Sequence, residues 1–198
     1  MSEAALIAGL DAGFADAVHQ AQSTFRAVLD ALARPGRIAV LAQPARAPAG
    51  ISPAAASVLA TLADLDTPVH LAPGLDGGAV AGFVTAGLGA PLAAAGAAAF
   101  ALVPAAALLP LTRFAEGSEA YPDRSATVIV EVAGLGSGEA LRLSGPGIRT
   151  VETLQVAGLP AGFLAAWADQ RPLFPLGVDL ILCCGDRLAG LPRTVRIG

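Results

Sequence analysis

Two residue types are missing from this chain of 198 residues. It contains no lysine and no asparagine, so all twelve of its basic residues are arginines. Covalent chemistry with pyridoxal phosphate requires a lysine that forms a Schiff base, and the Walker phosphate loop also requires a lysine. Both mechanisms are therefore excluded in their usual form.

Cysteine is also scarce. The only two, Cys183 and Cys184, are adjacent, so they form no disulfide framework, and the pair fits a reducing compartment. Both fall in a predicted strand, where successive side chains point to opposite faces. They are therefore interpreted as small buried apolar side chains and not as ligands of one metal ion.

Charged residues make up only 14% of the chain, apolar residues make up 55%, and the net charge is −4. Disorder as the main state is excluded, because it requires low hydrophobicity and high net charge. A nucleic-acid partner is not expected, because it requires a basic surface that replaces the counterions of phosphates. The length predicts one domain spanning residues 1–198, with 1–13 as a loose N-terminal segment.

Residues 77–112 carry no charged side chain, a length sufficient to cross a bilayer. The stretch is mostly Ala and Gly, however, and Pro91, Pro104 and Pro110 divide it into short pieces. These pieces suit a soluble α/β core better than a membrane helix. The N-terminus has no basic region followed by an apolar run, so we expect a cytoplasmic protein without a membrane segment.

Helical and extended patterns alternate in the first half of the chain, and hairpins are predicted in the second. Together they predict a single-domain α/β fold, in which helices flank a mixed β-sheet. Helices are expected at 14–33, 53–63, 76–88, 104–114 and 164–170, and strands at 38–41, 69–71, 98–102, 125–132, 140–143, 150–156, 178–183 and 188–191. We expect 125–132 to pair with 140–143 as a hairpin through the glycine-rich turn 134–138.

Few residues point to chemistry by themselves. His19 and His70 have no neighbours spaced for a catalytic triad or a zinc site, so both are interpreted as ordinary surface or core histidines. Asp64 and Asp66 have the oxygen ligands that suit magnesium. The alternative, which we favour, is a solvated turn in which the Asp66 side chain supports the approach to Pro68.

Arginines flank a second glycine-rich turn. Arg142 and Arg149 lie on either side of Gly145–Pro146–Gly147, whose backbone N–H groups suit an anion, and Arg193 lies near the C-terminus. If these arginines cluster around a cavity, they favour an anion site; singly, each is a surface arginine. Asp179 lies in an apolar strand and needs a partner, for which Arg193 is the candidate. We favour a structural ion pair over a catalytic role.

Five segments in this order and spacing resemble the PhnH family, a subunit of the bacterial carbon–phosphorus lyase system for phosphonate use. They are AQSTFRAVLDALARPGR (21–37), SVLATLADLDTPV (57–69), YPDRSATVIVEV (121–132), LRLSGPGI (141–148) and FPLGVDLILCCGDRLAGLPRT (174–194). The resemblance extends from about residue 14 to 196 and matches least well over 75–120.

The resemblance implies a small α/β homodimer whose fold is similar to that of pyridoxal-phosphate transferases without the cofactor site. It implies a core complex with PhnG, PhnI and PhnJ, joined by PhnL and PhnK. That system exchanges the adenine of ATP for a phosphonate and gives ribose 1-phosphonate 5-triphosphate. Radical cleavage of the carbon–phosphorus bond follows on an iron–sulfur cluster assigned to PhnJ. Two adjacent cysteines supply no cluster ligand set here, so no cofactor is expected.

The matching segments contain ten residues suited to binding a substrate or anion, or to forming an interface. They are Arg26, Asp64, Asp66, Thr67, Arg142, Gly145, Gly147, Asp179, Arg193 and Thr194. Three functions follow from them: a subunit with a structural or assembly role, an enzyme subunit that contributes arginines and carboxylates to a transferase site, or a stand-alone small-molecule binder with a degenerate transferase-like pocket.

Overall fold

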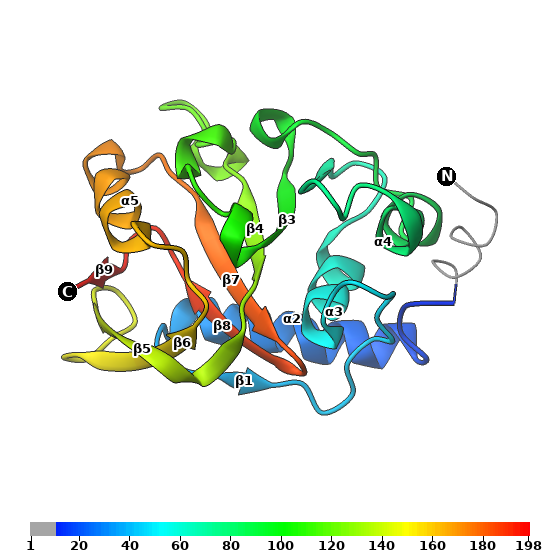
Figure 1. Ribbon diagram of the computed structural model, residues 1–198, viewed down its shortest axis with the longest axis horizontal. Coiled ribbons are helices and arrows are strands. Elements are labelled where there is room, and N and C mark those ends of the chain that lie inside the picture. Colours follow the sequence, from blue (N-terminus) through cyan, green and yellow to red (C-terminus); the bar gives the residue numbers. More distant parts are fainter. Residues whose placement is uncertain (1–10) are drawn as a thin grey trace.

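A six-stranded mixed sheet forms the centre of the molecule. The structure is a computed structural model and describes residues 11–198 (Figure 1). The strand order is β1-β8-β7-β4-β3-β2, in which β2, β3, β4 and β7 are mutually parallel and β8 is antiparallel to both of its neighbours, β7 and β1. The bounds are β1 Ala39–Val40, β2 Val69–Leu71, β3 Phe100–Pro104, β4 Thr127–Glu131, β7 Asp179–Cys184 and β8 Arg187–Leu191. The predicted α/β fold with a mixed sheet is confirmed.

A second, antiparallel sheet lies beside the first and has the order β6-β5-β9. Its strands are β5 Gly134–Ser144, β6 Glu152–Ala157 and β9 Arg196–Ile197. The predicted hairpin between 125–132 and 140–143 is therefore wrong, because β4 pairs only with β3 and β7. The segment 134–138 is no hairpin turn either. It is part of β5, where Leu135 and Glu139 both pair with Val156 around a bulge.

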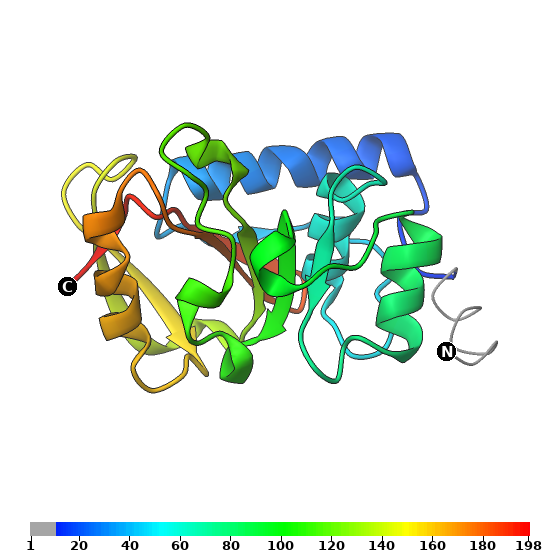
Figure 2. The same ribbon diagram turned by 90° about the horizontal axis from the view of Figure 1, so that it is seen from above.

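Three helical segments cover one face of the main sheet (Figure 2). They are α2 Ala17–Ala33, α3 Pro53–Leu62 and α4 Gly78–Gly82, the last continued by the π-helical turn η1 Phe83–Gly87. As the sequence predicts, Ser52 caps α3: its side chain accepts the N–H of Ala55. Gly190 in β8 allows α2 to pack closely, because a Cβ there would lie 2.7 Å from the Ala31 backbone.

The opposite face of the main sheet packs against the small sheet, α5 (Phe163–Asp169) and several 3-10 turns. These turns are η2 Ala95–Ala97, η3 Ala105–Ala107 and η4 Leu111–Arg113; two further 3-10 turns, η5 Pro122–Arg124 and η6 Arg171–Leu173, precede β4 and follow α5. The predicted helix over 104–114 is wrong: only η3 and η4 form there. Pro110 lies between them, where it offers no N–H and its ring obstructs a continuing helix.

The sheet separates two apolar clusters, and the adjacent cysteines divide between them. Cys183 is fully buried on the helix-covered face, whereas Cys184 is only partly buried, against the cluster on the other face. Their predicted orientation is confirmed. Most of the predicted loose segment 1–13 lies outside the described residues, although Gly13 forms a β-bridge with Arg46. Over residues 11–198, no helix is both long and apolar enough to cross a membrane.

Candidate anion-binding site

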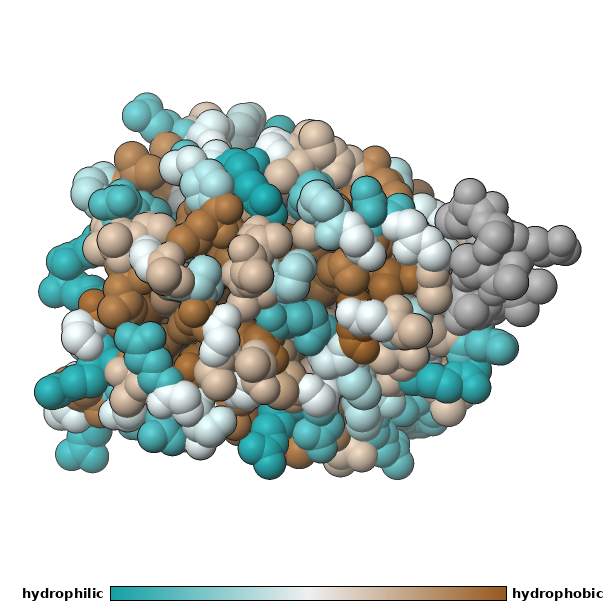
Figure 3. Space-filling view, viewed as in Figure 1, coloured by the Kyte–Doolittle hydropathy of each residue, from teal (hydrophilic) through white to brown (hydrophobic). Residues whose placement is uncertain are grey.

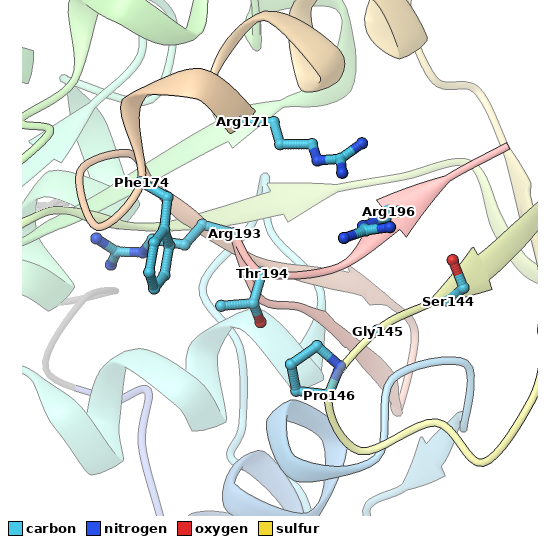
Figure 4. A pocket seen from close by; sticks show the side chains of 8 residues that line it. All are labelled: Ser144, Gly145, Pro146, Arg171, Phe174, Arg193, Thr194 and Arg196. Carbon is cyan, nitrogen blue, oxygen red and sulfur yellow. The ribbon is translucent and has the colours of Figure 1, made fainter.

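A cavity of about 570 Å³ opens where the two sheets meet the end of α5 (Figure 4). The last residue of β5, Ser144, and the turn Gly145–Pro146 form one side. Arg171 and Phe174, in and just after η6, form a second side, and the segment from Arg193 to Arg196 forms the floor between them. The lining contains three arginines and no carboxylate.

The glycine turn is fixed by close contact with α2. Gly147 has φ +80°, in the left-handed region, and a Cβ there would overlap the carbonyl oxygen of Ala33, the last residue of that helix. Gly145 also has a positive φ, and the N–H of Ile148 donates to its carbonyl at 3.1 Å. The turn therefore requires glycine at both positions, and it places Pro146 on the wall of the cavity.

The predicted partner of Asp179 is confirmed. The side chains of Arg193 and Asp179 are only 12% and 24% exposed and form an ion pair at 2.5 Å. Asp179 is the first residue of β7, and its Oδ1 also accepts the backbone N–H of Arg193 at 2.7 Å. The pair therefore joins the start of β7 to the segment that follows β8.

Every side-chain N–H of Arg193 is used inside the protein. Nε and Nη2 donate to the carboxylate of Asp179, and Nη2 also donates to Ser125 Oγ. Nη1 donates to the carbonyls of Pro122 at 3.3 Å and Pro175 at 3.2 Å. A guanidinium has five N–H donors. Because all five are occupied, Arg193 lines the cavity without a donor left for a ligand.

Arg171 and Arg196, by contrast, have unused side-chain donors. Both are exposed, and neither forms an ion pair or a side-chain hydrogen bond with any residue in the described part of the chain. Their side chains extend from η6 and β9 into the same space, with the Thr194 side chain nearby (Figure 4). Two unpartnered guanidinium groups of a protein with net negative charge thus face one cavity.

The position of Arg171 depends on its buried neighbour. Gln170 Oε1 accepts the N–H of Val178 at 3.0 Å, which ties η6 to the residue before β7. Arg196 is held by strand pairing, because it lies opposite Ser144 in the β5–β9 ladder. Arg171 and Arg196 are not among the residues predicted from the sequence. No local motif marks them, since their positions beside one cavity follow from the packing of α5 and β9.

The expected cluster of Arg142, Arg149 and Arg193 forms only in part. Arg142 lines a neighbouring cavity of about 300 Å³, which shares Ser144 and Arg196 with the first. Arg149 lines neither of these two cavities.

The other predicted residues lie elsewhere. Asp64, Asp66 and Thr67 form the turn before β2, the outermost strand of the main sheet on the side away from β7 and β8. The predicted turn is confirmed but its supporting residue is corrected: Asp64 Oδ1 accepts the N–H of Asp66 and the hydroxyl of Thr67, both at 3.0 Å. Arg26 is exposed in the middle of α2, beside Phe25.

The histidines fit the ordinary interpretation. His19 is exposed and its Nδ1 lies 2.7 Å from Asp16 at the start of α2. The hydrogen bonds that Asp16 accepts from His19 lower the pKa of that aspartate. His70, in β2, has Nδ1 at 3.2 Å from the carbonyl oxygen of Ala93 and its ring packs edge-on against Phe114.

A second partly buried carboxylate lies at the far end of the parallel strands. Glu131, the last residue of β4, accepts the N–H of Ser52 at 2.6 Å. Burial raises the pKa of the Glu131 carboxyl, against the opposing effect of the bond from Ser52. Burial also raises the pKa of the Cys183 thiol, and the nearby Glu131 carboxylate and Cys184 raise it further. These groups border neither arginine-lined cavity.

The fold and the cavity thus define an α/β protein with an arginine-lined, acid-free site at the amino ends of its parallel strands. The sequence profile of the family described as "Bacterial phosphonate metabolism protein (PhnH)" matches residues 12–198. The chain belongs to the PhnH family.

Two curated relatives agree with this assignment. The chain is 40% identical, over 93% of each chain, to the α-D-ribose 1-methylphosphonate 5-triphosphate synthase subunit PhnH of Rhizobium meliloti (strain 1021). It is 37% identical, over 89% of this chain and 85% of the relative, to HtxG of Stutzerimonas stutzeri, whose name assigns it to a C-P lyase.

Proposed function

We propose that this chain is a subunit of a carbon–phosphorus lyase core complex in phosphonate catabolism. The complex would convert ATP and an alkylphosphonate to α-D-ribose 1-alkylphosphonate 5-triphosphate and release adenine. The observation that carries this proposal is the alignment with the Rhizobium meliloti synthase subunit, which covers 93% of both chains at 40% identity. Because the alignment covers nearly the whole relative, a shared role follows more directly than from a match to one segment.

Within that complex we propose a structural or assembly role. The outer side of α2 leaves Val18, Phe25 and Leu29 exposed, at helical spacing, and Val40 lies exposed in β1, which α2 contacts. Apolar side chains grouped on a surface favour contact with another protein. The face of the molecule opposite α2 also exposes apolar residues, which are interspersed with polar ones (Figure 3). We propose the α2 side as the contact surface, because its exposed apolar side chains are grouped on one helix and the strand beside it.

The proposed partners are PhnG, PhnI and PhnJ, joined by PhnL and PhnK, with the isolated chain as a homodimer in the cytoplasm. We propose that this subunit works without a cofactor of its own. The lack of lysine supports this proposal with respect to pyridoxal phosphate, even if the fold is related to that of the transferases which use it.

A stand-alone small-molecule binder is the second candidate. The cavity with the free Arg171 and Arg196 favours it, because a ligand site within one chain needs no partner. The two candidates differ in whether the protein assembles with other subunits.

The test is co-expression of the tagged chain with the PhnG, PhnI and PhnJ proteins of its own genome, followed by affinity capture, size-exclusion chromatography and mass measurement. Co-elution in one stable complex is the expected result. A chain that elutes without these partners under all co-expression conditions contradicts the subunit proposal and leaves the stand-alone binder.

A pair of matched variants locates the contact. Phe25→Asp places a charge on the exposed side of α2, and Leu164→Asp does the same on α5; the two side chains are 45% and 44% exposed. We expect Phe25→Asp to weaken co-elution and Leu164→Asp to preserve it. Equal behaviour of both variants contradicts α2 as the contact surface.

A further inference from the structure

The three arginines beside the 570 Å³ cavity divide into one structural group and two free groups. Arg193 donates all five of its side-chain N–H groups to Asp179, Ser125 and two carbonyls, so the fold accounts for it completely. Arg171 and Arg196 contribute no side-chain hydrogen bond or ion pair within residues 11–198. The fold therefore uses neither guanidinium, although both are placed by well-packed neighbours.

The surroundings of these two groups suit an anion. No aspartate or glutamate lines the cavity, so no side chain on its walls neutralises the two guanidinium groups. The Thr194 hydroxyl supplies a further polar group, and Phe174 supplies an exposed apolar wall (Figure 4). A cavity of this size falls in the range of small-molecule sites, about 300–1,000 Å³.

The number and placement of the arginines indicate which anion. A guanidinium forms two parallel hydrogen bonds with the oxygens of one phosphoryl group. Arg171 and Arg196 come from separate elements on different sides of the cavity, so each can engage a different phosphoryl group. Beyond Arg196, the adjoining 300 Å³ cavity adds Arg142. This succession of guanidinium groups fits a chain of linked phosphates better than a single one.

We propose that this cavity binds the polyphosphate chain of a small molecule, with Arg171 and Arg196 as the binding residues and Arg193 as the positioning residue of the floor. The site would give the subunit a ligand-binding function in addition to assembly. It is a property of the isolated chain and does not depend on whether the chain enters a complex.

The test is calorimetric titration of the isolated chain with sodium tripolyphosphate at fixed ionic strength. Arg171→Gln and Arg196→Gln are each expected to weaken binding about 10-fold or more, because each removes charge-assisted hydrogen bonds to a phosphoryl group. Arg149→Gln is the matched control, since Arg149 is also an exposed arginine but lines neither cavity. It is expected to change the affinity less than twofold. Because both tested arginines are exposed and unbonded, thermal unfolding of all three variants should match the parent protein.

Three results would overturn the proposal. They are the absence of tripolyphosphate binding, equal weakening by Arg149→Gln, and equal competition by sulfate, which would mark diffuse attraction of any anion.

Parallel titrations with ATP show whether the phosphates alone or the whole nucleotide is recognised. Similar affinity for ATP and tripolyphosphate supports recognition of the phosphates themselves, whereas binding of ATP alone contradicts it. The same variants also separate this proposal from the proposed assembly role. If Arg171→Gln and Arg196→Gln lose tripolyphosphate binding but still co-elute with PhnG, PhnI and PhnJ, the two functions use different surfaces. If the parent protein co-elutes but binds no tripolyphosphate, only the proposal made here fails.

Discussion

The two ends of the parallel strands contain two partly buried carboxylates that are stabilised by different means. Asp179 begins β7 at the amino end and is paired with the Arg193 guanidinium. Glu131 ends β4 at the carboxyl end, where it has no cation beside it among the described residues and accepts the Ser52 N–H. Burial of a carboxylate is costly unless it is paired and hydrogen-bonded. The protein meets that cost with a full ion pair at one end, and at the other end the pKa of Glu131 is raised.

The comparison shows which end is built for rigidity. At the amino end, Arg193 joins the start of β7 to Ser125, Pro122 and Pro175, so one side chain fixes the floor of the cavity. In open α/β sheets ligands usually bind beyond the carboxyl ends of the strands. Here the arginine-lined cavity lies at the opposite end, and the rigid floor there is provided by an ion pair and not by a strand-to-helix turn.

Removal of Arg193 is the most direct way to break the amino end. Arg193→Ala leaves Asp179 without its cation and opens five hydrogen bonds. We expect a loss of about 3–5 kcal/mol in the free energy of unfolding, as for a buried pair that loses one partner. Urea unfolding measures it, with Arg149→Ala as the control for an exposed arginine. A loss below about 1 kcal/mol, typical of surface pairs, would contradict the structural role.

A double-mutant cycle sharpens this prediction. If the two side chains act as one unit, Asp179→Ala and Arg193→Ala together should cost less than the sum of the single losses, with a coupling of about 1–3 kcal/mol. Additive losses would mean that Arg193 acts through its other partners, Ser125 and the two carbonyls.

The turn beside the cavity gives the next largest expected effect. In Gly147→Ala the new Cβ meets the Ala33 carbonyl oxygen in addition to the strain of a positive φ. Gly89 has nearly the same φ, +75° against +80°, but open space around it. We expect Gly147→Ala to cost about 2–4 kcal/mol and Gly89→Ala about 1–2 kcal/mol by urea unfolding. Equal losses would show that α2 does not constrain the turn.

Local patterns predicted most of the elements. Val69–Leu71 has the predicted bounds, and Ser52 followed by Pro53 correctly marks the start of α3. The errors concern pairing and continuity. The glycine-rich stretch after β4 suggests a hairpin, but the apolar run of β4 is that of a strand buried on both faces of a parallel sheet.

Within the candidate site, the sequence predicts a contact only for a carboxylate that needs a neighbouring cation. Asp179 in an apolar strand required a cation, and this reasoning identified Arg193. Gly145 and Gly147 were recognised as a turn, and Thr194 also lines the cavity. The side chains of Arg171 and Arg196 form no hydrogen bond or ion pair within residues 11–198, so the fold does not require a guanidinium at either position. An arginine whose guanidinium has no partner in the fold cannot be recognised from its neighbours in the sequence. Arg171 and Arg196 come together only through the tertiary packing.

The carboxyl end gives the smallest expected effect, and its sign distinguishes it from the amino end. Because burial raises the pKa of Glu131 above its usual 4.5, the folded protein holds that proton more tightly than the unfolded chain does. The stability contributed by the protonated form is complete at low pH and is lost as the pH rises from about 4.5 through the folded-state pKa.

The variant Glu131→Gln tests this sign, because it keeps an oxygen for the Ser52 N–H but cannot ionise. Relative to this variant, the parent protein should therefore lose stability between pH 4.5 and pH 7.5 in thermal or urea unfolding. Glu139→Gln, at an exposed position, controls for the general effect of removing a carboxyl. If Glu131→Gln is instead less stable than the parent at pH 7.5 by more than at pH 4.5, the charged form is the stabilised one, and Glu131 would then resemble Asp179 after all.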